Sequence, residues 1–468
     1  MWIFDKAQSG LPLFCALVLV LILLPLASAS DETTYQLARD IYKELVEINT
    51  SDSAGDTTMA ALAMAARLKA AGFSDADVQV LEPSPRKGNF VARYHGSGKR
   101  KPLLLLAHLD VVEALKEDWS VDPFKFLEKD GFFWGRGTTD DKAMAAVWIA
   151  TFIRLRQENY VPDRDLVIAL TADEEGGDHN GVQWLIANRH DLIDAEYALN
   201  EGGESQMKDG KYLLNTVQPS EKIYQSFRLQ VRNSGGHSSR PVKDNAIYRL
   251  AEGLTRLSKF EFPARLNEVT KEYYRRMAAV NTGQTASDMK AVAKDSPDRG
   301  ALSRLSKSPF DNAMLRTTCV ATRLEAGHAE NALPQTARAI VNCRIVPGES
   351  PAEVRATLVR ILDDSKISVT AIGDAISSEP SPLKPEIMDV IEHVTTEMWS
   401  GVHVIPMMST GATDGLFLRK AGIPTYGISG FFEDVDDTRA HGRDERLGVK
   451  QFYEGCEFLY RVVKRLSS

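Results

Sequence analysis

Three short apolar runs, each followed by acidic or imidazole side chains, constrain the fold of this chain more than any other feature. They read LLLLAHLD at residues 103–110, LVIALTADEE at 166–175 and YALNEGG at 197–203. None alternates apolar with polar residues, so we expect central strands covered on both faces. The segments 141–158 and 180–193 have the apolar spacing of helices. Strand and helix therefore alternate, which predicts an α/β domain with a mostly parallel sheet covered by helices.

The pattern changes at Lys222. The stretch KIYQSFRLQVR alternates apolar and polar residues, as in a strand with one wet face. Further strands are expected at 315–327, 336–346 and 367–374, helices at 244–259 and 350–364, and a mixed helical stretch at 260–310. We therefore predict a smaller α+β two-layer domain at 218–379, inserted into a discontinuous larger domain at 30–217 and 380–468.

Size and charge narrow the class of partner. A chain of 468 residues exceeds the usual size of one domain, which agrees with two domains. The net charge is −8, and the basic residues form no cluster along the chain. Both features argue against a nucleic-acid partner. Small molecules or peptides are the expected substrates.

The N-terminus predicts a signal peptide at residues 1–29. An uncharged apolar run ends in Ala27-Ser28-Ala29 and is followed at once by the polar DETTYQ. Cleavage after Ala29 predicts a secreted or periplasmic protein. Because Lys6 is offset by Asp5, an uncleaved membrane anchor is the alternative, and only then is a membrane partner expected.

The cysteines leave two interpretations open. Cys15 lies within the apolar run, so three of the four cysteines remain in the mature chain and at least one thiol is unpaired. Cys319 and Cys343 can pair if their strands are neighbours, or they are small buried apolar residues.

Chemically reactive side chains follow the predicted strands. Ligands in open α/β sheets collect at the carboxyl ends of strands, and the residues found there are His108, Asp110, Asp140, Glu174, Glu175 and Glu201, with His441 late in the chain. Each motif alone has an ordinary explanation; Asp140 and Asp141, for example, suit the start of the helix at 141–158. Together, carboxylates and imidazoles at one sheet edge repel each other unless a divalent metal supplies positive charge.

Spacing within two motifs adds roles. His108 and Asp110 lie two apart on an extended chain and point to one side, so the Asp110 carboxylate can accept the second ring N–H of His108 and fix its tautomer. Glu174 and Glu175 are adjacent and cannot easily share one role. One is expected to bind metal while the other holds a water as general base.

Six ordered motifs resemble those of a known family. LLLLAHLDVV, WGRGTTDDKAMAA, LTADEEGG, LNEGG, GGHSSRP and AHGRDERL are similar to the motifs of the di-zinc metallopeptidases that include aminoacylase, bacterial glutamate carboxypeptidase, acetylornithine deacetylase and the yeast vacuolar Gly-X carboxypeptidase. The resemblance spans essentially the whole mature chain. It implies a zinc exopeptidase-like catalytic domain with an inserted lid and dimerisation domain.

The resemblance also implies two zinc sites. His108, Asp140 and Glu201 match the ligands of one zinc, and Asp140, Glu175 and His441 match those of the other, with cobalt or manganese able to substitute. Asp140 would bridge the metals, with a cis peptide after it. Glu174 matches the general base, which takes a proton from the bridging water and delivers it to the leaving amine, and Asp110 matches the partner of His108.

Further residues are implied in the inserted domain. His237 in GGHSSRP reads as a surface turn from composition alone, but the resemblance implies a histidine that reaches a partner subunit's active site and stabilises the oxyanion. Asn331 matches a substrate contact, and Arg344 is either a contact or part of a structural ion pair. These roles imply a homodimer through the smaller domain.

The loop STGATDGLFLRKAGIP resembles the one that binds the substrate carboxylate. Gly411 and Thr413 would provide backbone and hydroxyl donors. Many relatives have arginine after TDG, where this chain has Leu416. Arg419 is expected to serve instead, or to be an arginine on a helix surface.

Together these features predict an exported di-zinc hydrolase. A bridging hydroxide would attack an amide bond next to a free carboxylate, as in a carboxypeptidase or dipeptidase, with Glu174 as general base. The alternatives are an N-acyl-amino-acid amidohydrolase and a non-catalytic metal-dependent binding protein. A non-catalytic binding protein should lack the general base or one of the metal ligands, and this chain has the base and all five predicted ligands.

Overall fold

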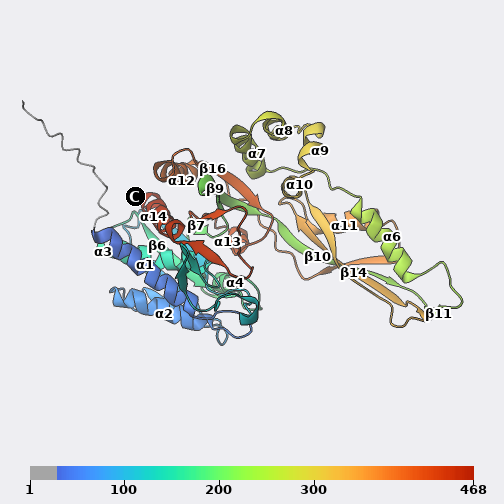
Figure 1. The fold of residues 1–468 in the computed structure, drawn as a ribbon, viewed down its shortest axis with the longest axis horizontal. Coiled ribbons are helices and arrows are strands. Elements are labelled where there is room, and N and C mark those ends of the chain that lie inside the picture. Colours follow the sequence, from blue (N-terminus) through green and yellow to red (C-terminus); the bar gives the residue numbers. More distant parts are fainter. Residues whose placement is uncertain (1–28) are drawn as a thin grey trace, which may run out of the picture.

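The chain forms two lobes, a larger domain and an elongated smaller one (Figure 1). The computed structural model describes residues 29–468. The predicted signal peptide lies outside the described residues except for Ala29, which begins α1 (Ala29–Glu47). Within the described part of the chain, no helix is both long and apolar enough to cross a membrane.

The larger domain is built on a ten-stranded mixed sheet. Its strands are, in order, β1 (Val78–Leu81), β2 (Asn89–Tyr94), β6 (Arg164–Thr171), β3 (Arg100–His108), β7 (Tyr197–Asn200), β17 (Thr425–Gly427), β9 (Lys211–Glu221), β8 (Ser205–Lys208) and β18 (Phe432–Asp434), with β16 (His403–Ser409) beside β9. The central pairs β6/β3, β3/β7 and β7/β17 are parallel. The predicted α/β class is therefore confirmed.

Helices cover both faces of this sheet. The helices α1, α2 (Thr57–Ala70), α3 (Lys142–Gln157), α12 (Pro385–Met398) and α14 (Val449–Leu466) pack on one face, and α4 (Gly181–Asn188), α5 (His190–Ile193) and α13 (Gly415–Lys420) on the other. Alternate residues of β3 enter opposite cores, because Leu103 and Leu105 belong to one cluster and Leu104 and Leu106 to the other. The apolar run at 103–106 is thus buried on both faces, as predicted.

A small three-stranded sheet joins distant parts of the chain. It contains β19 (Arg446–Gly448), β5 (Phe132–Trp134) and β4 (Leu127–Lys129), and the short helix η1 (Lys116–Asp118) precedes it in the sequence. Pairing of β5 with β19 places the loop before α3 next to the late segment AHGRDERL. Two motifs separated by about three hundred residues of chain thereby come together.

The smaller domain is a four-stranded antiparallel sheet with helices on one face. Its strands are β12 (Thr318–Ala326), β14 (Thr336–Ile345), β10 (Ile223–Arg232) and β15 (Ile367–Ile372), and α6 (Ala246–Ser258) and α11 (Pro351–Leu362) share their core. Cys319 and Cys343 are register partners on β12 and β14 and form a disulfide, and Cys456 is free and buried. A two-stranded ribbon of β11 (Gly236–His237) and β13 (Ala332–Leu333) forms the tip farthest from the larger domain (Figure 1).

Four helices of the predicted insertion pack elsewhere. They are α7 (Glu268–Val280), α8 (Gly283–Val292), α9 (Arg299–Leu305) and α10 (Pro309–Leu315). Their apolar residues share a core with Ile405, Met407 and Met408 of β16, a strand of the large sheet. The stretch 260–310 is helical as predicted, but its helices lie against the larger domain above the connection to the smaller one (Figure 1).

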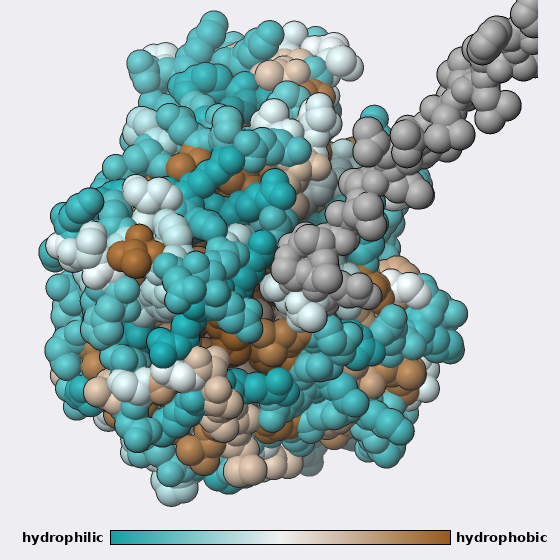
Figure 2. Space-filling model, turned by 90° about the vertical axis from the view of Figure 1, so that its left-hand side faces the viewer, coloured by the Kyte–Doolittle hydropathy of each residue, from teal (hydrophilic) through white to brown (hydrophobic). Residues whose placement is uncertain are grey.

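The end of the larger domain seen in Figure 2 is mostly hydrophilic. Hydrophobic side chains appear there only in small groups between polar ones. This agrees with burial of the long apolar runs inside the two clusters that flank the sheet.

Candidate metal centre

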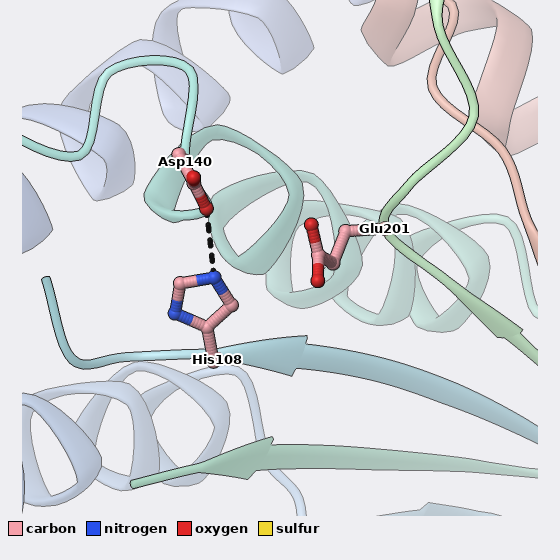
Figure 3. Close-up of side chains that lie close together, drawn as sticks. All are labelled: His108, Asp140 and Glu201. Carbon is pink, nitrogen blue, oxygen red and sulfur yellow. Dashed lines mark hydrogen bonds and ion pairs between the residues drawn. The ribbon is translucent and has the colours of Figure 1, made fainter. Parts of the chain in front are cut away.

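Three of the predicted ligands meet at the carboxyl end of the central strands. His108 ends β3, Glu201 follows β7, and Asp140 lies on the loop before α3. Their side chains point into one shared space (Figure 3), and His108 Nε2 lies 2.8 Å from Asp140 Oδ1. The ligand atoms of this group all lie within 4.8 Å of one another.

A second group shares Asp140 with the first. His441 Nε2 lies 2.9 Å from Glu175 Oε1 and 3.1 Å from Asp140 Oδ2. The ligand atoms of Asp140, Glu175 and His441 all lie within 4.8 Å of one another. The peptide bond after Asp140 is cis, as the resemblance implies. Asp141 starts α3, but its side chain makes no capping hydrogen bond. The helix-cap interpretation of the Asp140-Asp141 pair therefore does not account for these carboxylates.

The grouped side chains perturb one another strongly. Burial is the largest single influence on His108 and opposes its charge, but the hydrogen bond to Asp140 and the nearby carboxylate charges together raise the pKa of the imidazole well above its usual value. Hydrogen bonds to Asp140 and Glu175 raise the pKa of His441 to about 10. Burial, followed by the charge of Asp140, raises the pKa of Glu201 well above its usual value. Protons thus supply positive charge to the cluster, and a cation that binds there must displace them.

The donor set fits divalent cations. Among the described residues, no lysine or arginine forms an ion pair with Asp140, Glu174, Glu175 or Glu201. Carboxylates buried without such a partner are costly. The two groups together offer two imidazoles and three carboxylates, and the carboxylate of Asp140 belongs to both groups. Zinc, cobalt and manganese accept ligands of these types.

Asp110 has a different role from the one predicted. His108 Nδ1 hydrogen-bonds the backbone carbonyl of Asp110 at 2.9 Å, while the nearer carboxylate oxygen is 3.7 Å away. The carboxylate instead accepts the backbone N–H groups of Glu174 at 3.2 Å and Glu175 at 2.9 Å. The chain turns after β3 so that the carbonyl reaches the ring first. Asp110 therefore fixes the ring tautomer through its backbone and holds the Glu174-Glu175 turn through its side chain.

Glu445 is a site residue that sequence reasoning missed. Its fully buried carboxylate pairs with Arg136 at 2.7 Å and accepts the backbone N–H groups of Gly137, Thr139 and Asp140 at 3.0, 2.7 and 3.2 Å. These bonds fix the loop that carries Asp140. Glu445 stands among other charged residues in AHGRDERL, so nothing in the sequence distinguished it from its neighbour Asp444.

Arg344 and Glu174 line the same cavity of about 460 Å³ between the two domains. Arg344 is the next-to-last residue of β14. Its guanidinium lies 4.8 Å from the centre of the Tyr224 ring. No described carboxylate forms an ion pair with it, so the structural ion pair considered for Arg344 is absent from the described chain. Leu416 also lines this cavity. A guanidinium without a carboxylate partner among the described residues therefore lines the same cavity as the general-base candidate.

Three predicted carboxylate-binding residues are engaged within the protein. Arg419 forms an ion pair with Glu221 at 2.7 Å, with both side chains at most 3% exposed. The Thr413 hydroxyl and N–H donate to the same Glu221, at 3.0 and 3.1 Å, and the Gly411 N–H donates to the Ser409 hydroxyl at 3.0 Å. The charge of Arg419 is therefore already neutralised in the core, and the described structure does not present it as a free anchor for a substrate carboxylate.

His237 and Asn331 lie together at the tip of the smaller domain. His237 is in β11, and the Asn331 carbonyl accepts the N–H of Ser238 at 3.0 Å. This ribbon is at the opposite end of the molecule from α1 and α3 (Figure 1). Within one chain, neither residue lines the cavities that contain the metal-ligand candidates.

A mixed α/β sheet whose parallel central strands gather two carboxylate-imidazole groups around one shared aspartate defines a hydrolase of the metallopeptidase class. The family model for "Peptidase family M20/M25/M40" matches residues 104–465, so the chain belongs to that peptidase family.

Individual proteins agree with this assignment. The chain is 28% identical to the human N-fatty-acyl-amino acid synthase/hydrolase PM20D1, over 78% of this chain and 74% of that protein. It is 26% identical to carboxypeptidase S of Saccharomyces cerevisiae, over 78% and 71%.

Solved structures share the fold at low identity. A family M20 metallo-carboxypeptidase from Sulfolobus solfataricus has a TM-score of 0.69 and 16% identity, with 92% of this chain and 99% of that chain covered. The Bacillus subtilis YXEP protein, described as a dinuclear metal-binding peptidase, has a TM-score of 0.60 and 11% identity, with 93% and 99% covered.

Proposed function

We propose that this protein is a di-zinc hydrolase that cleaves an amide bond next to a free carboxylate. The observation that carries the proposal is the position of Arg344, whose unpaired guanidinium lines the same cavity as Glu174 and Glu175. An arginine fork recognises a carboxylate through two parallel hydrogen bonds. A substrate carboxylate bound there brings the adjacent amide to the metal-ligand candidates.

Each side chain has a distinct task in this proposal. His108, Asp140 and Glu201 would hold one cation, and Asp140, Glu175 and His441 the other. Bound cations polarise a carbonyl and lower the pKa of a water. Glu174 takes the proton of the attacking water and passes it to the leaving amine. Burial, with the nearby charge of Glu201, raises the pKa of Glu174 well above its usual value, which favours a carboxyl that can retain that proton.

Two substrate classes place a carboxylate in the same position. A carboxypeptidase or dipeptidase acts on peptides, and an amidohydrolase acts on N-acyl amino acids. The second class is favoured by the human relative, whose name describes an N-fatty-acyl-amino acid synthase/hydrolase. The signal-like segment at 1–29 supports a location outside the cytoplasm, secreted or periplasmic, for the proposed enzyme.

Recognition of the carboxylate by Arg344 can be tested with one substrate pair. We expect Arg344→Met to lower kcat/KM for an N-acyl amino acid by about 10²-fold, because a hydrogen-bonded charge pair is lost. The C-terminal amide of the same substrate should be poor for the wild type and no worse for the variant. Arg338→Met, an exposed position on the same strand, is the matched control. Equal losses on acid and amide would contradict the assignment.

His237 and Asn331 support a homodimer through the smaller domain. Both lie at the tip of that domain, away from the cavities of their own chain, and they are neighbours through the β11/β13 ribbon. In a dimer, the tip of one subunit can reach the other subunit's site. His237 would then stabilise the oxyanion that forms at the attacked carbonyl.

Mixed dimers test this arrangement. Glu174→Gln and His237→Ala should each be nearly inactive as homodimers. Co-expression with different affinity tags yields heterodimers in which one site has both an intact Glu174 and an intact histidine from the other subunit. We expect these heterodimers to recover activity. If His237 acts within its own chain, no site in the mixture is complete and the heterodimers stay inactive.

A further inference from the structure

A second and larger cavity meets the metal-ligand candidates at different residues from the one that contains Arg344. Its volume is about 770 Å³, within the range of roughly 300–1,000 Å³ for small-molecule sites. Asp140 and Glu201 line it where it meets the metal groups, and Thr413 lines both this cavity and the one that contains Arg344. Both cavities therefore adjoin the candidate site, one at Asp140 and Glu201 and the other at Glu174 and Glu175.

The wall of the larger cavity is mainly apolar. Its large apolar side chains include Leu214, Tyr273, Met277, Phe310, Met407 and Phe431. Unbranched methionine side chains adapt to flexible apolar ligands. Phe310 remains 44% exposed although its ring lies 6.3 Å from that of Tyr273. An apolar ligand in this cavity would cover apolar surface that is otherwise open to water.

The larger cavity offers no partner for a substrate carboxylate among the described residues. No described lysine, arginine or histidine lines it, and its acidic lining residues are Asp140, Asp141, Glu201, Glu204 and Glu433. Among the described residues that line the two cavities, only Arg344 offers a cationic partner. The group on the acyl side of the amide is therefore the one that enters the larger cavity.

The helices of the insertion build the far wall. Tyr273 and Met277 are one turn apart on α7 and line the cavity, and Phe310 lies on α10. Tyr273 itself belongs to the buried core shared with β16, together with Tyr274 and Ala278, and Met277 packs against that core. The wall is thus fixed to the large sheet, and its side chains set the length and width of the space.

We propose that this cavity binds the extended apolar acyl chain of an N-acyl amino acid, and that Tyr273, Met277 and Phe310 determine the acceptable chain length. This inference rests on the proposed function, because it assigns the acyl side of the same amide. It favours lipid-like N-acyl amino acids over short free dipeptides as substrates.

A series of N-acyl leucines tests the inference on the full metal-loaded protein. With acetyl, butanoyl, octanoyl and hexadecanoyl groups, kcat/KM should rise by about fourfold for each buried methylene until the cavity is filled. Met277→Trp should fill the cavity and remove the gain for the long chains while N-acetyl-leucine is still cleaved. Ala279→Trp introduces the same side chain at an exposed position of α7 and should leave the series unchanged. Phe310→Ala should lower kcat/KM for the hexadecanoyl substrate by about tenfold.

The outcomes separate this inference from the proposed function. Cleavage of N-acetyl-leucine and dipeptides with no gain along the series would overturn the acyl-chain site while leaving the hydrolase proposal intact. The same holds if Met277→Trp and Ala279→Trp give identical series. If no carboxylate-bearing amide is cleaved, the proposed function itself fails. Retained hydrolysis of N-acetyl-leucine by Met277→Trp shows that the variant is folded.

Discussion

Glu174→Gln is expected to lower kcat by about 10³-fold while metal binding is unchanged. The substitution keeps the shape of the side chain and removes its ability to accept and return a proton, a contribution of about 10²–10⁴-fold in other enzymes. Glu174 belongs to neither candidate ligand group. Steady-state kinetics and the metal content of the purified variant, measured by mass spectrometry, check both parts of the expectation.

A matched control exists on the same turn. Asp178 is exposed and lies four residues later, so Asp178→Asn removes a carboxylate without touching the site. It should retain wild-type kcat. A Glu174→Gln variant that turns over substrate at the wild-type rate would remove Glu174 from the mechanism. Loss of metal together with activity would instead make it a ligand.

Asp140→Ala is expected to abolish binding of both metals, whereas Glu175→Gln and Glu201→Gln should each weaken the binding of only one metal. Asp140 is the residue common to both groups, and Glu175 and Glu201 belong to one each. Because bound cations supply several kcal/mol of transition-state stabilisation, kcat/KM should fall by at least about 10³-fold in Asp140→Ala.

Metal stoichiometry and thermal stability give readouts independent of activity. A cation that binds only the folded state raises the melting temperature. Added zinc should therefore raise Tm for the wild type, less for the two single-group variants, and not for Asp140→Ala. Two metals retained by Asp140→Ala, or equal losses in all three variants, would show that Asp140 is not shared.

The larger domain was predictable because its signals are local. A strand buried on both faces must be apolar at every position, and the run at 103–106 meets that condition in both cores. The ligand candidate His108 ends β3, Glu201 directly follows β7, and Glu175 lies in the loop after β6. Parallel strands bring their carboxyl ends to one edge. Their proximity followed from order along the chain.

The errors share one physical cause. Arg419, Thr413 and Gly411 looked like free donors, but their partners Glu221 and Ser409 are supplied by other strands. Likewise, the 260–310 helices have no local signal that directs them to β16 rather than to the smaller domain. The partner of each polar group is set by the packing of segments that are far apart in the sequence. The spacing of residues along the chain does not contain that information.

By itself, the sequence determined the α/β class, and it predicted an inserted second domain and a set of possible metal ligands, because each depends on periodicity or on residue chemistry. Only the tertiary structure decided which charges are neutralised and which stay free. Arg419 is buried against Glu221, whereas Arg344 has no such partner among the described residues and lines a cavity with Glu174. It also decided that α7 and α10 enclose an apolar cavity beside Asp140 and Glu201. A cavity and an unpaired charge are properties of space left between elements, and that space exists only once the chain has folded.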